Sequence, residues 1–178
     1  LNINFSFDMK IEKEPKGILL HWIVNVKRRR KEHILSDQLY SKLDFWWGTI
    51  SALFAASVGT SIFATMSLNP AWYWKLAVGL VSFLSAIIMV LHTYYKFGEK
   101  AEKHRSAGMR YSSIKREIEE SMFKIEDLSK EEANELLSRI RTKIDIIHEG
   151  APQSPKRIFE KVYKEWPERQ IDDYKEEN

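Results

Sequence analysis

The side chains best suited to acid–base or metal chemistry are the five histidines of this 178-residue chain. Two histidines bind one metal from a helix when they are four residues apart, because that spacing puts both rings on the same face. No pair at that spacing occurs among His21, His33, His92, His104 and His148. The absence of cysteine excludes disulfides, thiolate zinc sites and cysteine nucleophiles. We therefore expect neither a metal nor another cofactor.

Other catalytic motifs are also missing from the sequence. No serine lies in a Gly-x-Ser-x-Gly context, and the seven glycines are scattered rather than gathered in a phosphate-binding loop. Carboxylates such as Glu117, Glu119 and Glu120 have the spacing of a solvated helix face. We therefore predict that the chain is not an enzyme.

The charged residues are unevenly distributed along the chain. They make up 30% of it, yet Lys75 is the only Asp, Glu, Lys or Arg between Phe45 and Tyr95. His92 is the other titratable group in that stretch and lies near its end. A long uncharged stretch flanked by charge is typical of membrane-crossing segments.

Two apolar segments, at about 45–68 and about 72–97, are each long enough to cross a bilayer as a helix. Asn69-Pro70 predicts a tight turn between them, so the two helices are antiparallel. Aromatic residues mark the segment ends, as they do at membrane interfaces: Phe45, Trp46, Trp47, Trp72, Tyr73, Trp74, Tyr94 and Tyr95. A buried hairpin of a soluble protein is the less favoured alternative.

The positive charges predict the orientation of this hairpin. Lysines and arginines are concentrated before the first segment and after the second, while the tip offers only Lys75. The positive-inside rule then places both termini in the cytoplasm.

A basic cluster precedes the hairpin: Lys27, Arg28, Arg29, Arg30 and Lys31. It belongs to a predicted amphipathic helix at 17–43, which follows an N-terminal segment at 1–16. We expect an interfacial helix whose cluster faces anionic lipid, and favour this over direct nucleic-acid binding.

The region 98–178 is predicted to be helical and cytoplasmic, after a membrane domain at 44–97. Because no proline lies between Ala71 and Ala151, the simplest prediction is one helix from the hairpin tip to about Glu126. Ser129 and Glu132 form a capping box for the next helix, which Gly150 ends, and Ser154-Pro155 begins a third that reaches Trp166. We predict an all-α fold. The apolar faces of these helices either form a small bundle with the N-terminal helix or form the contact surface of an oligomer.

Small residues recur on one side of the first apolar segment: Gly48, Ala52, Ala56, Gly59, Thr60 and Ala64. Small residues at such spacing let helix backbones approach closely in lipid. This small-residue stripe could pack within the hairpin or between copies of the chain, and the sequence leaves both open.

Around the end of the second segment, from Thr93 to Tyr111, Glu99 and an Ala101-x-x-His104 spacing are followed by a small-residue pair and by Tyr111. This pattern resembles the SLATT family of two-helix membrane domains, over roughly residues 20–170. The matching positions are Glu99, Ala101, His104, Gly108 and Tyr111.

The resemblance implies a pore-forming effector of antiphage defence and abortive infection. Such an effector oligomerises in the bacterial inner membrane, as a multi-pass protein among membrane lipids, and permeabilises it on activation. The implied trigger is a nucleotide second messenger, a nucleotidyltransferase or a reverse transcriptase encoded nearby. A membrane-tethered scaffold for a cytoplasmic enzyme or ribonucleoprotein is the alternative.

Overall fold

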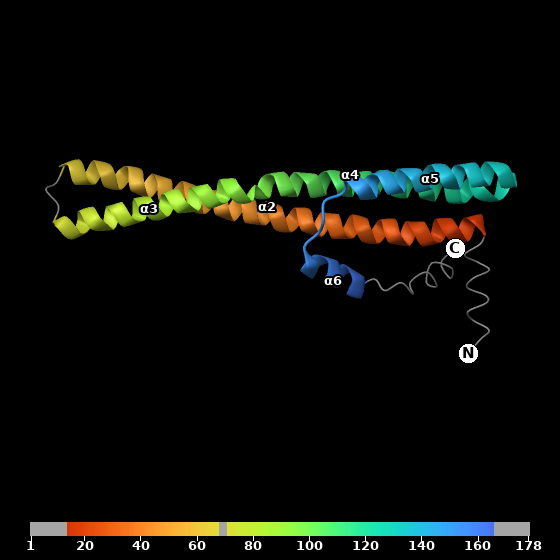
Figure 1. Ribbon diagram of the computed structural model, residues 1–178, viewed down its shortest axis with the longest axis horizontal. Coiled ribbons are helices and arrows are strands. Elements are labelled where there is room, and N and C mark those ends of the chain that lie inside the picture. Colours follow the sequence, from red (N-terminus) through yellow and green to blue (C-terminus); the bar gives the residue numbers. More distant parts are fainter. Residues whose placement is uncertain (1–13, 68–70, 166–178) are drawn as a thin grey trace. The chain divides into compact units, whose positions relative to one another are not determined.

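The computed structural model describes residues 14–67 and 71–165, with the backbone alone for 62–67. Every regular element in these ranges is helical, which confirms the predicted all-α class (Figure 1). The elements are α2 (Pro15–Ser67), α3 (Trp72–Tyr95), α4 (Phe97–Lys124), the 3₁₀ turn η1 (Ile125–Asp127), α5 (Lys130–Gly150) and α6 (Lys156–Glu165). They divide into two units: a bundle unit, residues 1–37 and 103–178, and a hairpin unit, residues 38–102.

Helix α2 is a single helix of 53 residues, about 80 Å long at 1.5 Å per residue. It begins at Pro15, whose missing N–H costs nothing in a first helical turn. The helix predicted at 17–43 and the first apolar segment thus belong to one continuous helix. In its N-terminal part, Leu19, Ile23 and Val26 are buried against other helices of the bundle, so these side chains face protein and not a membrane interface.

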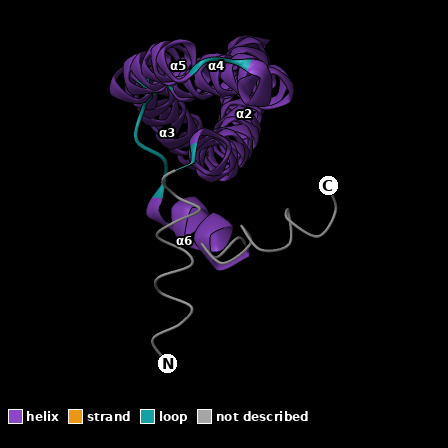
Figure 2. Ribbon diagram, turned by 90° about the vertical axis from the view of Figure 1, so that its right-hand side faces the viewer, coloured by secondary structure: helices purple, strands orange, loops and turns teal. Residues whose placement is uncertain are grey.

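The bundle unit is built from the N-terminal part of α2, α4 and α5, which pack side by side around one core (Figure 2). Ile118 of α4 and Ile140 of α5 are both fully buried. Burial of each such side chain contributes about 1.5–3 kcal/mol. The predicted three-helix bundle is thus present, with core residues Leu19, Ile23, Val24, Val26, Tyr111, Ile114, Ile118, Ile125, Ala133, Leu137 and Ile140.

The predicted continuous helix from the hairpin tip to Glu126 is interrupted at Lys96. This residue has φ 48° and ψ 49°, the left-handed conformation, and it separates α3 from α4. The Lys96 carbonyl accepts a hydrogen bond from the Lys100 N–H, 3.1 Å, at the start of α4. Asp44 stabilises the new N-terminus, because its Oδ1 accepts from the Gly98 N–H at 3.0 Å.

The capping box that the sequence predicts for α5 is confirmed. The Ser129 N–H donates to Glu132 Oε2 at 2.9 Å, and the Glu132 N–H donates to Ser129 Oγ at 3.3 Å. At the other end, α5 ends at Gly150 as predicted; Gly150 is the last helical residue, and the cap position itself is the extended Ala151, with φ −83°. Helix α6 follows Pro155 as predicted, whereas Trp166 lies outside the described residues.

The hairpin unit has an apolar surface. Among the described residues, one helical stretch, Trp72–Asp127, contains a window long and apolar enough to cross a membrane, with a mean hydropathy of 2.2. Only 6% of that window is buried. The tip at 68–70 lies outside the described residues.

Candidate functional site

Three helices bring titratable side chains together inside the bundle unit. His33 of α2 and His104 of α4 are 3% and 2% exposed, and their Nδ1 atoms lie 2.9 Å apart. The ring of His33 also stacks on Tyr111, with centroids 5.5 Å apart and planes inclined by 14°. The Tyr111 hydroxyl lies 3.4 Å from Nδ1 of His148 on α5. Residues 71 positions apart in sequence thus belong to one polar cluster, which is buried at His33, His104 and Tyr111 and exposed at His148.

The two imidazoles must adopt opposite tautomers. Because a hydrogen bond needs one donor and one acceptor, one Nδ1 carries a proton and the other offers its lone pair. Burial, and then the charges of His104, Arg29 and His148, lower the pKa of His33 to about 4. Burial also lowers the pKa of His104, against the opposing effect of Glu32 and Asp37. The pair is therefore held neutral near pH 7.

Burial raises the pKa of Tyr111, so its hydroxyl keeps its proton and can donate to His148. Glu32, only 3% exposed, is paired with Arg29 at 3.2 Å between Oε2 and Nη1. Ser36 is fully buried and donates to the Glu32 carbonyl at 2.9 Å. These groups satisfy one another inside the bundle, as buried polar groups require.

The basic cluster 27–31 is more buried against other parts of the protein than a lipid-facing cluster would be. Arg28 is 5% exposed, donates to the Asn25 side chain, and lies 4.1 Å above the ring of Tyr163 on α6. Arg30 Nε donates to Ser112 Oγ at 2.7 Å, and Ser112 in turn donates to the Gly108 carbonyl.

Within this cluster only Lys31 is exposed, while Lys27 and Arg29 are half-buried. Burial and the nearby Lys115 lower the pKa of Lys27, against the opposing effect of Glu119. The lipid-facing assignment is therefore wrong for Arg28, since its guanidinium is enclosed by the bundle unit.

Two cavities flank the polar cluster and share Arg29, Tyr111 and His148 as lining residues. The first, about 300 Å³, is also lined by His21, Trp22, Arg28 and Tyr163, and has no carboxylate in its lining. The second, about 450 Å³, includes Glu32, Glu149 and Ser154. The first cavity has the composition of an anion-binding site.

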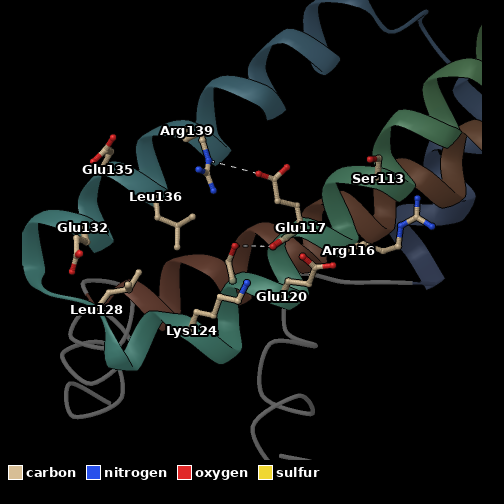
Figure 3. Close-up of a pocket in the computed structure, with 11 residues that line it drawn as sticks. Ser113, Arg116, Glu117, Glu120, Lys124, Leu128, Glu132, Glu135, Leu136 and Arg139 are labelled. Carbon is tan, nitrogen blue, oxygen red and sulfur yellow. Dashed lines mark hydrogen bonds and ion pairs between the residues drawn. The ribbon is translucent and has the colours of Figure 1, made fainter.

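A larger groove of about 680 Å³ lies between α4 and α5 (Figure 3). Charged residues pair across the two helices: Glu117 of the groove contacts Arg139 of the groove at 3.8 Å and Lys143, just outside it, at 2.7 Å. Because opposite charges here neutralise one another in an exposed setting, we interpret the groove as a salt-bridged surface.

The predicted family positions lie mainly on the inner face of α4. Ala101, His104 and Tyr111 are buried, and Gly108 is buried where a Cβ would meet His33 and Ile34 at 3.7 and 3.6 Å. Glu99 instead is exposed and pairs with Lys96 at 3.0 Å. The pattern that suggested the resemblance thus contributes to the bundle and its polar cluster.

The small-residue stripe of the hairpin unit lies mostly on the surface. Ala52, Ala56 and Thr60 are exposed, and Gly48 and Gly59 are half-buried. A Cβ on Gly48 would lie 3.7 Å from His92, whereas one on Gly59 would meet no described atom within 4 Å. Ala64 belongs to α2, but its side chain lies outside the described residues. Packing within the hairpin thus leaves three stripe positions uncovered.

The hairpin unit also contains a histidine contact: Nε2 of His92 lies 3.3 Å from Asp44 Oδ1. Asp44 thereby joins α2 to both the end of α3 and the start of α4. We assign this contact a structural role.

Sequence spacing does not predict the His33–His104 pair, because the two histidines lie on different helices, 71 residues apart. A usable signal was present: His33 lies seven residues after Val26, and His104 lies on the apolar stripe of α4. Within the described ranges, no group of three His, Cys, Asp or Glu side chains could hold a metal ion. Comparison with protein-family models, curated proteins and solved structures finds no match to this chain.

Proposed function

We propose that the chain is a membrane effector of antiphage defence, which self-associates through its hairpin and permeabilises the inner membrane on activation. The observation that carries the membrane part of this proposal is the exposed apolar surface of α3. Large side chains along the whole helix are 36–66% exposed, most of them on the face opposite the buried Ser85: Leu76, Leu80, Phe83, Leu84, Ile87, Met89, Val90 and Leu91. An apolar surface of this extent is covered by lipid or by another protein.

The aromatic residues support a spanning rather than a surface-bound helix. Trp72, Tyr73 and Trp74 are exposed at one end of α3, and Tyr94 and Tyr95 at the other. The 24 residues of α3 extend about 36 Å, which fits a hydrocarbon core of about 30 Å with interfacial rings at both ends. With residues 45–67 of α2 as the second span, both termini are cytoplasmic.

Self-association is required by the number of spans. Two helices cannot enclose an aqueous path, so permeabilisation needs several copies of the hairpin. The exposed Ala52, Ala56 and Thr60 form a surface on which helices of different copies can approach closely. The resemblance to SLATT domains supplies the defence context, and with it a trigger from a nucleotide second messenger, nucleotidyltransferase or reverse transcriptase.

The test is membrane potential in bacteria that express the full chain and are challenged with a panel of phages. We expect infected cells to lose a potential-sensitive dye signal before lysis. The matched control carries Leu80→Lys and Leu84→Lys, which make insertion of α3 costly. Retention of full potential across the panel by cells with inserted wild-type protein rejects the effector proposal.

A scaffold is the second candidate, because the bundle unit exposes large apolar side chains. Phe123 is 85% exposed, Met109 57% and Ile146 60%. Such residues could hold a soluble enzyme or ribonucleoprotein at the membrane. Co-purification of a stoichiometric partner that is lost in Phe123→Ser, with no change in membrane potential, favours the scaffold over the effector.

A further inference from the structure

The smaller of the two cavities beside the polar cluster is lined by positive charge without a carboxylate. Arg28 and Arg29 line it together with His21 and His148, and no Asp or Glu is among its lining residues. Arg29 is partly neutralised by Glu32 at 3.2 Å. Among the described residues, no carboxylate pairs with Arg28. The cavity therefore has an excess of positive charge.

Arg28 is the key residue because it is buried and incompletely bonded. It is 5% exposed, and its Nε is enclosed without a hydrogen-bond partner. One terminal nitrogen donates to Asn25, and Cζ lies 4.1 Å from the centre of the Tyr163 ring. A buried cation that no carboxylate neutralises is costly, and an anion in the adjoining cavity would offset that cost. Arginine has a fork of donors that matches the oxygens of a phosphate or carboxylate.

The rest of the lining fits a flat group attached to that anion. Trp22 and Tyr163 contribute aromatic surface from α2 and α6, and Tyr111 from α4. A volume of about 300 Å³ is at the small end of ligand-binding pockets, which suits one ring and one phosphate. Two guanidinium groups beside one cavity favour a doubly charged oxyanion over a singly charged one.

We infer that this cavity binds a small phosphate monoester carrying a planar ring, with Arg28 as the principal contact. The phosphate accepts from the guanidinia of Arg28 and Arg29, and the ring lies against Trp22 or the edge of Tyr163, since Arg28 and Phe159 cover the two faces of Tyr163. A phosphate group could belong to a soluble molecule or to a lipid headgroup, and the experiment separates these sources. The inference does not depend on the proposed membrane function.

The test is calorimetric titration of the full chain, in discs of uncharged zwitterionic lipid, with phenyl phosphate. We expect saturable binding that Arg28→Met weakens at least tenfold, since methionine keeps the apolar stem and removes the donors. Arg30→Met is the matched control: it removes an arginine of the same cluster that lines neither cavity. Phenol should bind at least tenfold more weakly than phenyl phosphate, because it has no phosphate.

A second variant distinguishes the loss of one contact in the site from a general folding defect. Tyr163→Leu retains Arg28 and shortens the aromatic wall, and we expect it to weaken phenyl phosphate more than inorganic phosphate. The lipid arm repeats the titration in discs that contain phosphatidic acid: loss of phenyl phosphate binding there, restored in excess ligand, assigns the site to a headgroup. Equal affinity of wild type, Arg28→Met and Arg30→Met, or no binding of either phosphate by the wild type, overturns the inference.

Discussion

The Nδ1 atoms of His33 and His104 lie 2.9 Å apart in the bundle, with the Tyr111 ring stacked on one of the two imidazoles. This contact joins α2 to α4 where both side chains are almost inaccessible to water. Protonation of both imidazoles would place two positively charged rings in contact, at a buried position where water solvates neither. The contact therefore makes the bundle sensitive to acid.

The first prediction concerns pH. The pKa of His33 is lowered to about 4 in the folded chain from 6.5, so the unfolded chain binds more protons between these values. The stability that the folded chain gains from neutral His33 is complete above pH 6.5 and is lost as the pH falls towards 4. His33 alone contributes about 3 kcal/mol. Hydrogen exchange of amides in α2 and α4, corrected for the intrinsic rate, should show opening that increases over this range.

The control for this pH effect is His21→Gln, which keeps the pair intact. We expect it to retain the wild-type pH profile, while His33→Gln flattens it. A profile that is as steep in His33→Gln as in the wild type contradicts the assignment to His33.

The second prediction concerns Gly108, where α2 and α4 approach closely. A Cβ there would lie 3.6 Å from Ile34 and 3.7 Å from His33, which is ordinary contact. Gly108→Ala should therefore be neutral or stabilise by up to about 1 kcal/mol, through higher helix propensity. Gly108→Leu should destabilise by about 1–3 kcal/mol, because the larger side chain overpacks the contact. Denaturant unfolding followed by near-ultraviolet circular dichroism checks both, and equal effects of Ala and Leu argue against close packing.

The third prediction concerns the left-handed residue between α3 and α4. Lys96→Gly should stabilise the chain by about 1 kcal/mol, since glycine adopts φ 48° without the Cβ contact that lysine suffers. Lys100→Gly is the matched control inside α4 and should destabilise by about 1 kcal/mol. The readout is the thermal midpoint in detergent. Destabilisation of the same size in both variants would show that Lys96 is not strained.

The fourth prediction concerns the small-residue stripe. Ala56→Leu places a large side chain on the exposed part of the stripe and should reduce the oligomer in detergent towards monomer. Ala86→Leu, at an exposed alanine of α3 outside the stripe, should leave the oligomer unchanged. Mass photometry or analytical ultracentrifugation measures both. If Ala56→Leu keeps the wild-type mass, the stripe does not mediate assembly.

The elements of this fold that apolar periodicity controls could be predicted from the sequence. The stripes containing Ile118 and Ile140 indicate which faces of α4 and α5 are buried, because a 3.6-residue repeat leaves little freedom in that choice. The capping box of Ser129 and Glu132 likewise depends only on residues three positions apart.

The remaining errors come from contacts that are distant in sequence. Lys96 adopts a conformation typical of glycine, so its residue type gives no signal for the break between α3 and α4. Arg28 belongs to a run of charge that is typical of an exposed surface, but Tyr163, more than a hundred residues away, covers it. The His33–His104 contact depends on how two helices face each other, which neither helix specifies alone.

The polar contacts between α2 and α4 also determine how far one helix can slide along the other. Arg30 bonds Ser112, and His33 bonds His104. A shift of α4 by one turn, about 5.4 Å, would bring either Gly108 or Arg116 to Arg30, and either Lys100 or Gly108 to His33. Glycine in either place removes a hydrogen bond, Arg116 would oppose Arg30, and Lys100 would bring a charge into the buried site of His33. The side chains on the two helices therefore encode a single axial alignment, which apolar residues repeating along a stripe would leave degenerate.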